Sequence, residues 1–379
     1  MNTTSLKRLG ILTGGGDCPG LNAALRAVAK TALAHGVVPV GIEDGFEGLV
    51  DGRMRTLDET DLSGIIAFGG TVLGTSNKGD PFHFPVETTP GHIEIRDVSA
   101  RVLEQLSTHR IDALVAIGGD GTMHIARRLG TLGVRVVGVP KTIDNDLAAT
   151  DQTFGYDSAV TVVCEAIDRL NTTAAAHHRV MVVEVMGRYA GWIALGGGVA
   201  GGADVILMPE FAWDWPALLD KVNARSASGK RYSIVCVAEG AKLPGSTDAV
   251  VQEIDPKRTD ARRLGGVGTV IAHEIERRTG HETRVTTLGH LQRGGSPTAY
   301  DRLLATSLGG FAARCALEGR FGVMAALRGT AVVAVPIDEA VASLRTVPPD
   351  HPLVRAARDL GTCFGDAPAT PQCNAAPSV

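Results

Sequence analysis

Short apolar runs alternate along the chain with longer stretches whose apolar residues recur at helical spacing. The clearest run holds four valines between residues 134 and 139 and ends at Pro140, which is typical of a buried parallel strand. Similar runs predict strands at residues 9–13, 37–42, 113–117, 180–185, 205–207, 232–238, 285–288 and 331–335. Helical spacing predicts a helix at residues 22–36, capped by Asn22, and a helix that begins after residue 121. The same spacing predicts helices at residues 99–109, 158–173, 190–199, 268–278 and 301–317.

This alternation predicts an α/β fold with mainly parallel sheets. The pattern starts again near residue 180, and 379 residues exceed what one hydrophobic core usually serves. We therefore expect two Rossmann-like, three-layer α/β/α domains whose strand ends face one another across an active-site cleft. Residues 366–379 are rich in alanine and proline, and we expect them to be disordered.

The composition is that of an ordinary globular protein, with 44% apolar and 21% charged residues. The net charge of -4 and the absence of a long basic block argue against a nucleic-acid surface. No apolar segment approaches the ~18 residues of a membrane span, and the N-terminal one is too short for a signal peptide. Six scattered cysteines without CxxC spacing indicate reduced thiols and a cytoplasmic protein.

Three glycine-rich stretches lie next to predicted strands, and each could bring main-chain N–H groups to a phosphate. They are residues 14–20, residues 68–82 with Asn77 and Lys78, and residues 118–122 with Asp120. At the third, phosphates could approach the main chain while Asp120 holds a magnesium ion. The first stretch matches neither the dinucleotide fingerprint nor the Walker sequence, so a purely structural glycine turn remains the alternative.

Residues 141–146, KTIDND, place a lysine and two carboxylates directly after the central strand. Burying such groups is costly unless they meet a ligand, a metal or one another. The alternative is a plain solvated turn, because Asp144, Asn145 and Asp146 are good turn formers.

Arginines recur at strand ends. Arg179 begins a predicted strand that Arg188 ends, and Arg284 begins another whose far end leads to His290 and Arg293. Guanidinium forks suit phosphate oxygens, so the set favours a sugar phosphate, although each arginine alone could be a surface charge.

Phosphoryl transfer needs a donor cradle, magnesium, a cation on the migrating group and a carboxylate that takes the acceptor proton. The chain offers a candidate for each part. Asp144 would be the base, Asp120 and Asp146 the magnesium carboxylates, and Arg188 the charge stabiliser.

Seven motifs together resemble the 6-phosphofructokinase family and keep its order over about residues 5–335. They are GGGDCPGLNAALR (14–26), GGDGT (118–122), PKTIDND (140–146), TFGYDSA (153–159), RVMVVEVMGRYAG (179–191), AEG (238–240) and RVTTLGHLQRGGSP (284–297). GGDGT also occurs in NAD kinases and lipid kinases, whereas TIDND with MGR and GHLQRGGSP is hard to find elsewhere. The resemblance implies phosphorylation of the 1-hydroxyl of fructose 6-phosphate by a magnesium-bound donor.

The resemblance also implies roles for single residues. Asp144 would be the general base, assisted by Thr142 and Asp146, and Arg188 would stabilise the transferring phosphoryl group. The sugar phosphate would be held by Met186, Gly187, Glu239, His290 and Arg293. Arg179 and Arg284 would reach it from a neighbouring subunit, which implies a homotetramer or at least a dimer. The donor site would be lined by Gly15, Asn77, Lys78, Asp120, Gly121, Thr122 and Lys141.

By the same resemblance, residues 1–150 with about 292–342 would form the domain that binds ATP and magnesium. Residues 151–291 with about 343–365 would bind fructose 6-phosphate. Arg26, Arg53 and Lys230 resemble basic residues of the family's effector site between subunits, and each is equally well explained as a surface charge.

The choice of donor depends on two positions. Family members that use pyrophosphate usually carry aspartate where Gly121 stands, and that carboxylate fills the α-phosphate space. Lys141 instead resembles the pyrophosphate users, because the best-known bacterial ATP enzymes have glycine there. Gly121 with Lys141 is the mixed pattern of a subgroup in which ATP enzymes are found, so ATP is the predicted donor. Asn77 stands where the best-known ATP enzymes carry an arginine, and Lys78 could substitute for it.

Two alternatives remain. One is a reversible, pyrophosphate-dependent enzyme that also accepts sedoheptulose 7-phosphate. The other is a catalytically silent sugar-phosphate sensor, which the presence of Asp144, Asp146 and Arg188 disfavours.

Overall fold

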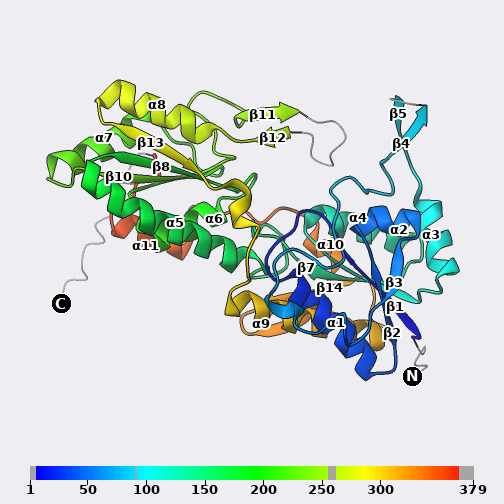
Figure 1. Ribbon diagram of the computed structural model, residues 1–379. Coiled ribbons are helices and arrows are strands. Elements are labelled where there is room, and N and C mark those ends of the chain that lie inside the picture. Colours follow the sequence, from blue (N-terminus) through cyan, green and yellow to red (C-terminus); the bar gives the residue numbers. More distant parts are fainter. Residues whose placement is uncertain (1–5, 90–91, 255–261, 367–379) are drawn as a thin grey trace, which may run out of the picture.

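The computed structural model describes residues 6–89, 92–254 and 262–366 (Figure 1). Apart from residue 366, the C-terminal segment predicted to be disordered lies outside the described residues. Two sheets organise the chain, and the smaller one lies beside the larger one in Figure 1.

The larger sheet has seven strands in the order β15-β14-β7-β6-β1-β2-β3. Their bounds are β1 Arg8–Thr13, β2 Val38–Ile42, β3 Met54–Thr56, β6 Ala113–Gly118, β7 Val136–Pro140, β14 Val323–Arg328 and β15 Ala331–Pro336. All neighbours pair in parallel except the two edge pairs, β2 with β3 and β14 with β15. β6 and β7 are buried along their whole length, which explains their continuous apolar sequence.

Helices cover both faces of this sheet. On one face α1 (Leu21–Ala34) packs against α9 (Ala299–Leu317), and both belong to one apolar cluster. Residues of α2 (Gly45–Asp51), α3 (Ser99–Thr108), α4 (Asp120–Thr131) and α10 (Ile337–Ala340) form a second cluster on the other face. The result is the expected three-layer arrangement.

The smaller sheet has four parallel strands in the order β13-β8-β10-β9. Their bounds are β8 Val180–Val185, β9 Val205–Leu207, β10 Ser233–Ala238 and β13 Thr283–Thr287. On one face lie α5 (Tyr156–His177) and α6 (Trp192–Ala200), with α11 (Pro352–Asp359) packed on α6. On the other face lie α7 (Trp215–Ala227) and α8 (Val267–Thr279).

One apolar core extends through both domains. The apolar cluster under α1 and α9 continues without a break to α5, α6 and the inner face of the smaller sheet. Strands of the larger sheet come from residues 8–140 and 323–336, and those of the smaller sheet from residues 180–287. This distribution has the chain order expected for two α/β domains, while the boundaries at 150, 292 and 342 stay predictions.

Some elements were not predicted. They are β3, β14, α2, α7, α10, α11 and the hairpins β4 (Phe84–Thr89) with β5 (His92–Arg96) and β11 (Val251–Ile254) with β12 (Arg262–Leu264). The hairpin β4–β5 projects from the larger domain, and β11–β12 extends from the smaller domain toward the larger one (Figure 1). Both hairpins lack a strongly apolar face, so their sequences give little strand signal.

The role expected for Asn22 as a helix cap is wrong. The cap of α1 is Gly20, and Asn22 is buried inside the first turn. Its side-chain amide donates to the carbonyls of Phe68 (3.1 Å) and Gly69 (3.3 Å), and its oxygen accepts from the N–H of Val72 (2.9 Å). Tertiary contact with the second glycine-rich loop therefore takes the polar groups that a cap would use.

The expectations about cysteines and membranes agree with the described residues. The five cysteines in the described part of the chain are free thiols, and Cys18, Cys236 and Cys315 are buried. Among the described residues, no helix combines the length and apolar character that crossing a bilayer requires.

Candidate active site

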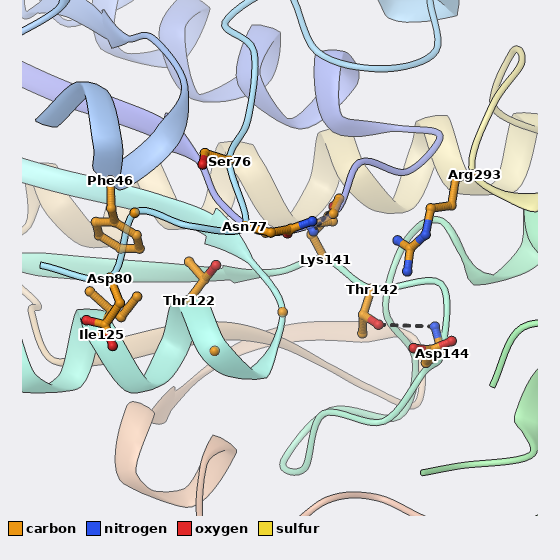
Figure 2. A pocket seen from close by; sticks show the side chains of 15 residues that line it. Phe46, Ser76, Asn77, Asp80, Thr122, Ile125, Lys141, Thr142, Asp144 and Arg293 are labelled. Carbon is orange, nitrogen blue, oxygen red and sulfur yellow. Dashed lines mark hydrogen bonds between the residues drawn. The ribbon is translucent and has the colours of Figure 1, made fainter. Parts of the chain in front are cut away.

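A cavity of about 290 Å³ lies at the carboxyl ends of β1, β6 and β7. We call it the donor cavity; it is lined by Gly15, Gly16, Phe46, Ser76, Asn77, Gly79, Asp80, Gly119, Gly121, Thr122, Ile125, Lys141, Thr142, Asp144 and Arg293. In Figure 2, Phe46 and Ile125 lie at one end and Asp144 and Arg293 at the other. Asp80 lies at the same end as Phe46 and Ile125, so the cavity runs from an end that combines two apolar side chains with one carboxylate to the charged end at Asp144 and Arg293.

Two glycines of the first glycine-rich loop have no room for a side chain, and the second of them, Gly16, lines the cavity. A Cβ atom on Gly14 would lie 2.6 Å from Oγ1 of Thr122, and one on Gly16 would lie 2.7 Å from a guanidinium nitrogen of Arg293. The hydroxyl of Thr75 donates to the carbonyl of Gly15 (2.5 Å) and so ties the second glycine-rich loop to the first. Both loops therefore bring main-chain groups close to whatever occupies the cavity.

Gly121 differs from these glycines. It lies in the first turn of α4 and lines the donor cavity, and a Cβ atom there would have no heavy atom within 4 Å. A side chain at this position would project into free space in the cavity.

Lys141 is buried between the loops and carries a pKa lowered mainly by that burial. Its ammonium group donates to the carbonyl of Gly16. The lysine therefore fixes the glycine loop and also presents its charge to the donor cavity.

A second cavity of about 440 Å³, the acceptor cavity, is formed by residues of both domains. Its lining is Gly16, Asp17, Asn77, Asp144, Asp146, Glu184, Met186, Arg188, Tyr189, Glu239, Gln252, Leu264, Gly265, Thr287, Gly289, His290 and Arg293. It is far richer in charged side chains than the donor cavity. The predicted residues Met186, Arg188, Glu239, His290 and Arg293 converge here.

The two cavities meet at Asp144 and Arg293, which line both, together with Gly16 and Asn77. Oδ1 of Asp144 is buried and has no hydrogen-bond partner among the described residues. Burial raises the pKa of Asp144, and the charges of Arg293 and then Arg188 oppose that rise. Asp144 thus carries one carboxylate oxygen without a hydrogen-bond partner among the described residues, at the place where the two cavities meet.

The loop that carries Asp144 is held at several points. The N–H of Asp144 donates to the hydroxyl of Thr142 (3.1 Å), and that hydroxyl donates to Asp146 (3.2 Å). Asn145 adopts a left-handed conformation with φ 52°, and its side-chain oxygen accepts from the N–H of Thr153 (3.0 Å). These bonds fix the main chain at Asp144 and the carboxylate of Asp146 before any ligand binds.

A segment far along the chain also braces this loop. The guanidinium of Arg345 donates to the carbonyl of Asn145 (3.2 Å). The main-chain N–H of Arg345 donates to the carbonyl of Asp146 (2.7 Å). Arg345 in turn lies over the ring of Trp192, 4.3 Å from its centroid. Arg345 thus contributes to the geometry of the loop that carries Asp144.

Asp146 and Asp120 are both carboxylates whose pKa is raised above the ordinary aspartate value. Burial and then the charge of Asp144 raise the pKa of Asp146 to about 7, and Asp120 adds to that rise. Burial also raises the pKa of Asp120, and the ring of His124 lies 3.5 Å from its carboxylate. Asp120 lines neither cavity. A divalent cation would relieve this repulsion, and Mg²⁺ favours one or two carboxylates together with phosphate oxygens, so these residues fit the ion.

Comparisons with known proteins agree with this geometry. The Phosphofructokinase family profile matches residues 8–316. The chain belongs to the phosphofructokinase family. It is 49% identical over 361 residues to an ATP-dependent 6-phosphofructokinase of Chloroflexus aggregans, covering 95% of this chain and 98% of the relative.

Overall identity does not separate the two donors. The chain is also 50% identical over 346 residues to a pyrophosphate–fructose 6-phosphate 1-phosphotransferase of Amycolatopsis methanolica, covering 91% of this chain and 97% of the relative. Among solved structures, the phosphofructokinase of Pichia pastoris superposes with a TM-score of 0.77 at 32% identity over 89% of this chain and 36% of its own.

Two of the predicted phosphofructokinase residues lie away from both cavities. Arg179 precedes β8 and Arg284 lies near the start of β13, so both are at the amino ends of these strands, whereas the acceptor cavity is at the carboxyl ends. Both arginines contact Glu282, Arg179 at 2.9 Å. Their role at a neighbouring subunit's site stays a prediction.

Other predicted residues also lie outside the cavity linings. Lys78 is exposed next to Asn77, and Gly187 turns the chain with φ 135° between Met186 and Arg188. Among the candidate effector residues, Arg53 pairs with Asp44 (3.3 Å) and with Asp51, while Lys230 is exposed.

Sequence reasoning missed part of both linings. In the donor cavity it missed Ser76, Asp80 and Ile125, and in the acceptor cavity it missed Asp17, Glu184, Tyr189, Gln252, Leu264, Gly265, Thr287 and Gly289. A buried glutamate inside an otherwise apolar strand was the one available signal, and it pointed to Glu184. Gln292 was missed as well: it is fully buried and accepts from the N–H of Met186 (3.3 Å).

Proposed function

We propose that the protein transfers the γ-phosphoryl group of ATP to the 1-hydroxyl of fructose 6-phosphate, giving fructose 1,6-bisphosphate and ADP. The observation that carries this proposal is the meeting of the donor and acceptor cavities at Asp144 and Arg293. A phosphoryl group passing between two bound substrates must cross such a junction, next to a base and a cation.

In this reaction Asp144 takes the proton of the 1-hydroxyl while that oxygen bonds to the γ-phosphorus and the bond to ADP breaks. Arg188 and Arg293 face the charge that develops on the migrating group. Thr142 and Asp146 hold Asp144 in position. Asp120 and Asp146 would hold magnesium, which supplies charge neutralisation on the donor phosphates when it is bound.

Two features of the donor cavity favour ATP over pyrophosphate. Gly121 leaves free space where an aspartate side chain would repel a phosphate. Phe46 and Ile125 line the far end, and apolar surface suits the base of a nucleotide but has no counterpart in pyrophosphate. The ammonium group of Lys141 already donates to the carbonyl of Gly16, so a structural role explains this lysine without pyrophosphate as the donor.

The deciding experiment compares initial rates with fructose 6-phosphate and magnesium when ATP or pyrophosphate is the donor at matched concentrations. We expect kcat/KM to be higher with ATP, measured as fructose 1,6-bisphosphate formed. A higher value with pyrophosphate would establish the reversible enzyme instead and would invite a test of sedoheptulose 7-phosphate. Absence of product with both donors, together with retained binding of the sugar phosphate, would identify the silent sensor.

We further propose a cytoplasmic enzyme of glycolysis that works as a homotetramer or dimer. Free cysteines support a reducing compartment. Arg179 and Arg284 lie away from their own acceptor cavity, which supports a role in a neighbour's site. Light scattering would measure the number of subunits in the assembly. Mixing the inactive Asp144→Asn variant with the Arg284→Ala variant should restore activity only if sites are shared between subunits. Arg26, Arg53 and Lys230 remain candidate effector ligands, to be tested with ADP and phosphoenolpyruvate.

A further inference from the structure

The acceptor cavity has one wall that the proposed roles leave unused. Gln252 of β11, Leu264 of β12 and the adjoining Gly265 form part of it. Glu184 and Thr287 complete it from the ends of β8 and β13, where they are paired in register. Residues 251–254 and 262–265, which we call the arm, thus bring polar and apolar groups to the same side of the cavity as two core strands.

Glu184 anchors the arm to the smaller sheet. Its carboxylate is buried with 2% exposure and accepts from the N–H of Gly266 (2.9 Å) and of Gly268 (2.7 Å). These N–H groups lie at the beginning of α8, where a negative charge is favoured. The residues directly after β12 are therefore fixed to β8.

Gly265 joins this anchor to Gln252. It has φ 136°, and a Cβ atom there would lie 2.9 Å from the side-chain nitrogen of Gln252 and 3.3 Å from a carboxylate oxygen of Glu184. Only glycine lets the amide and the carboxylate approach the main chain from these two sides. The amide of the exposed Gln252 side chain thus lies close to the main chain of Gly265, where both border the cavity.

The chemistry of this wall suits hydroxyl groups rather than a phosphate. Gln252 offers an N–H donor and a carbonyl acceptor, and Thr287 offers a hydroxyl. Glu184 adds a buried carboxylate, which disfavours a phosphate close by. Burial and then the charge of Asp144 raise the pKa of Glu239 to about 7, and Glu184 adds to that rise. The basic side chains among the described lining residues, Arg188, His290 and Arg293, come from other segments.

We propose that Gln252 is an acceptor-binding residue that hydrogen-bonds a hydroxyl of the sugar phosphate, and that Glu184 is a positioning residue that holds the arm in place for this contact. The proposal rests on the proposed function, because it names a further contact to the same acceptor. It makes the arm a determinant of acceptor specificity, separate from the donor cavity.

The test compares Gln252→Ala with the wild type and with Glu253→Ala, a neighbour on the same strand that does not line the cavity. For Gln252→Ala, KM for fructose 6-phosphate should rise about three- to tenfold, the range of one neutral hydrogen bond. KM for the donor should stay within twofold, and Glu253→Ala should leave both KM values within twofold. Thermal melting checks that each variant is folded.

Two outcomes would overturn the proposal: an acceptor KM within twofold of the wild type in Gln252→Ala, or equal rises in the KM values of donor and acceptor. Glu184→Gln alone should also raise the KM for fructose 6-phosphate. In the double variant with Gln252→Ala it should raise that KM by less than a further twofold, because both changes act on one contact. Additive effects would contradict the positioning role.

Calorimetric titration of fructose 6-phosphate without donor separates this proposal from the function itself. If the wild type forms no product with either donor, the proposed reaction fails. Weaker binding of the sugar phosphate to Gln252→Ala than to Glu253→Ala would still support the contact, and equal binding would refute it.

Discussion

The two cavities are built in opposite ways although they share Asp144 and Arg293. The donor cavity is formed mainly by main chain: glycines of three loops let N–H groups and a helix start approach the ligand, and few charged side chains take part. The acceptor cavity is formed by charged and polar side chains from both domains. A nucleotide's phosphates can thus be held by main-chain dipoles, whereas the sugar phosphate depends on individual side chains.

This difference predicts how each cavity responds to mutation. In the donor cavity, adding a side chain should do the most damage, because the site depends on free space next to glycine. In the acceptor cavity and at the junction, removing a side chain should do the most damage, because each one carries a separate contact.

The largest effect is expected at the junction. Asp144→Asn keeps the shape of the residue but cannot accept a proton, so kcat should fall by ~10² to 10⁴ while both KM values change little. The measurement is steady-state kinetics with saturating donor and acceptor. Asp97→Asn, which replaces a carboxylate that lines neither cavity, should leave kcat unchanged. A loss of only a few-fold in Asp144→Asn would disprove the assignment of the base.

Gly121→Asp tests the free space in the donor cavity. A carboxylate about 4 Å from a phosphate costs about 4 kcal/mol at an effective dielectric constant of 20, so kcat/KM for ATP should fall by about 10² or more. The ratio of pyrophosphate to ATP activity should rise, because the shorter donor can avoid the new charge. The matched control is Gly130→Asp on the same helix, where a Cβ atom also meets nothing within 4 Å. Equal losses with both donors would contradict the steric argument.

The pH dependence should report the junction rather than the donor cavity. Asp144 must be ionised to act as a base, and burial raises its pKa, so activity is present above that pKa and is lost as the pH falls through it. The acidic limb of kcat/KM for fructose 6-phosphate should lie above the ordinary aspartate range of about 4 and fall about tenfold per pH unit. An acidic limb at the ordinary aspartate pKa would show that Asp144 is not held in this environment.

Asp146→Asn sharpens the same measurement. Asp146, whose pKa burial and then the charge of Asp144 raise to about 7, is electrostatically coupled to Asp144. Its removal should shift the acidic limb to lower pH, even though kcat also falls if magnesium is held there. No shift would mean that the two carboxylates titrate independently.

The smallest effect is expected from the brace on the catalytic loop. Arg345→Met removes the hydrogen bond to the carbonyl of Asn145 but keeps an apolar stem over Trp192, so kcat should fall about three- to tenfold with little change in KM. Arg355→Met, at an exposed position of the same segment, serves as the control. A change in KM alone would place the effect in binding rather than in the geometry of the loop.

Much of the fold could be predicted from periodicity because most core strands are buried on both faces and read as apolar runs. β1, β6, β7, β8 and β10 lie within a few residues of their predicted positions. The edge strand β3 and the hairpin β4–β5 were missed, because half-exposed strands carry a weaker apolar pattern.

The candidate site divides in the same way. Its glycine loops and the polar residues after β7 could be predicted from the nearby sequence. Positive φ angles favour glycine, and a carboxylate directly after an apolar strand stands out in the sequence. The contact of Arg345 with Asn145 could not be predicted from the nearby sequence, because it joins positions 200 residues apart.

By itself, the sequence determined where the chain could form strands, helices and phosphate-binding turns, because these depend on the local order of apolar, glycine and charged residues. Only the tertiary structure decided which turns face each other and that Gln252 lies beside Glu184 at the acceptor cavity. The reason is physical: local propensity acts over a few residues, whereas a cavity between two domains is set by the packing of whole sheets and helices.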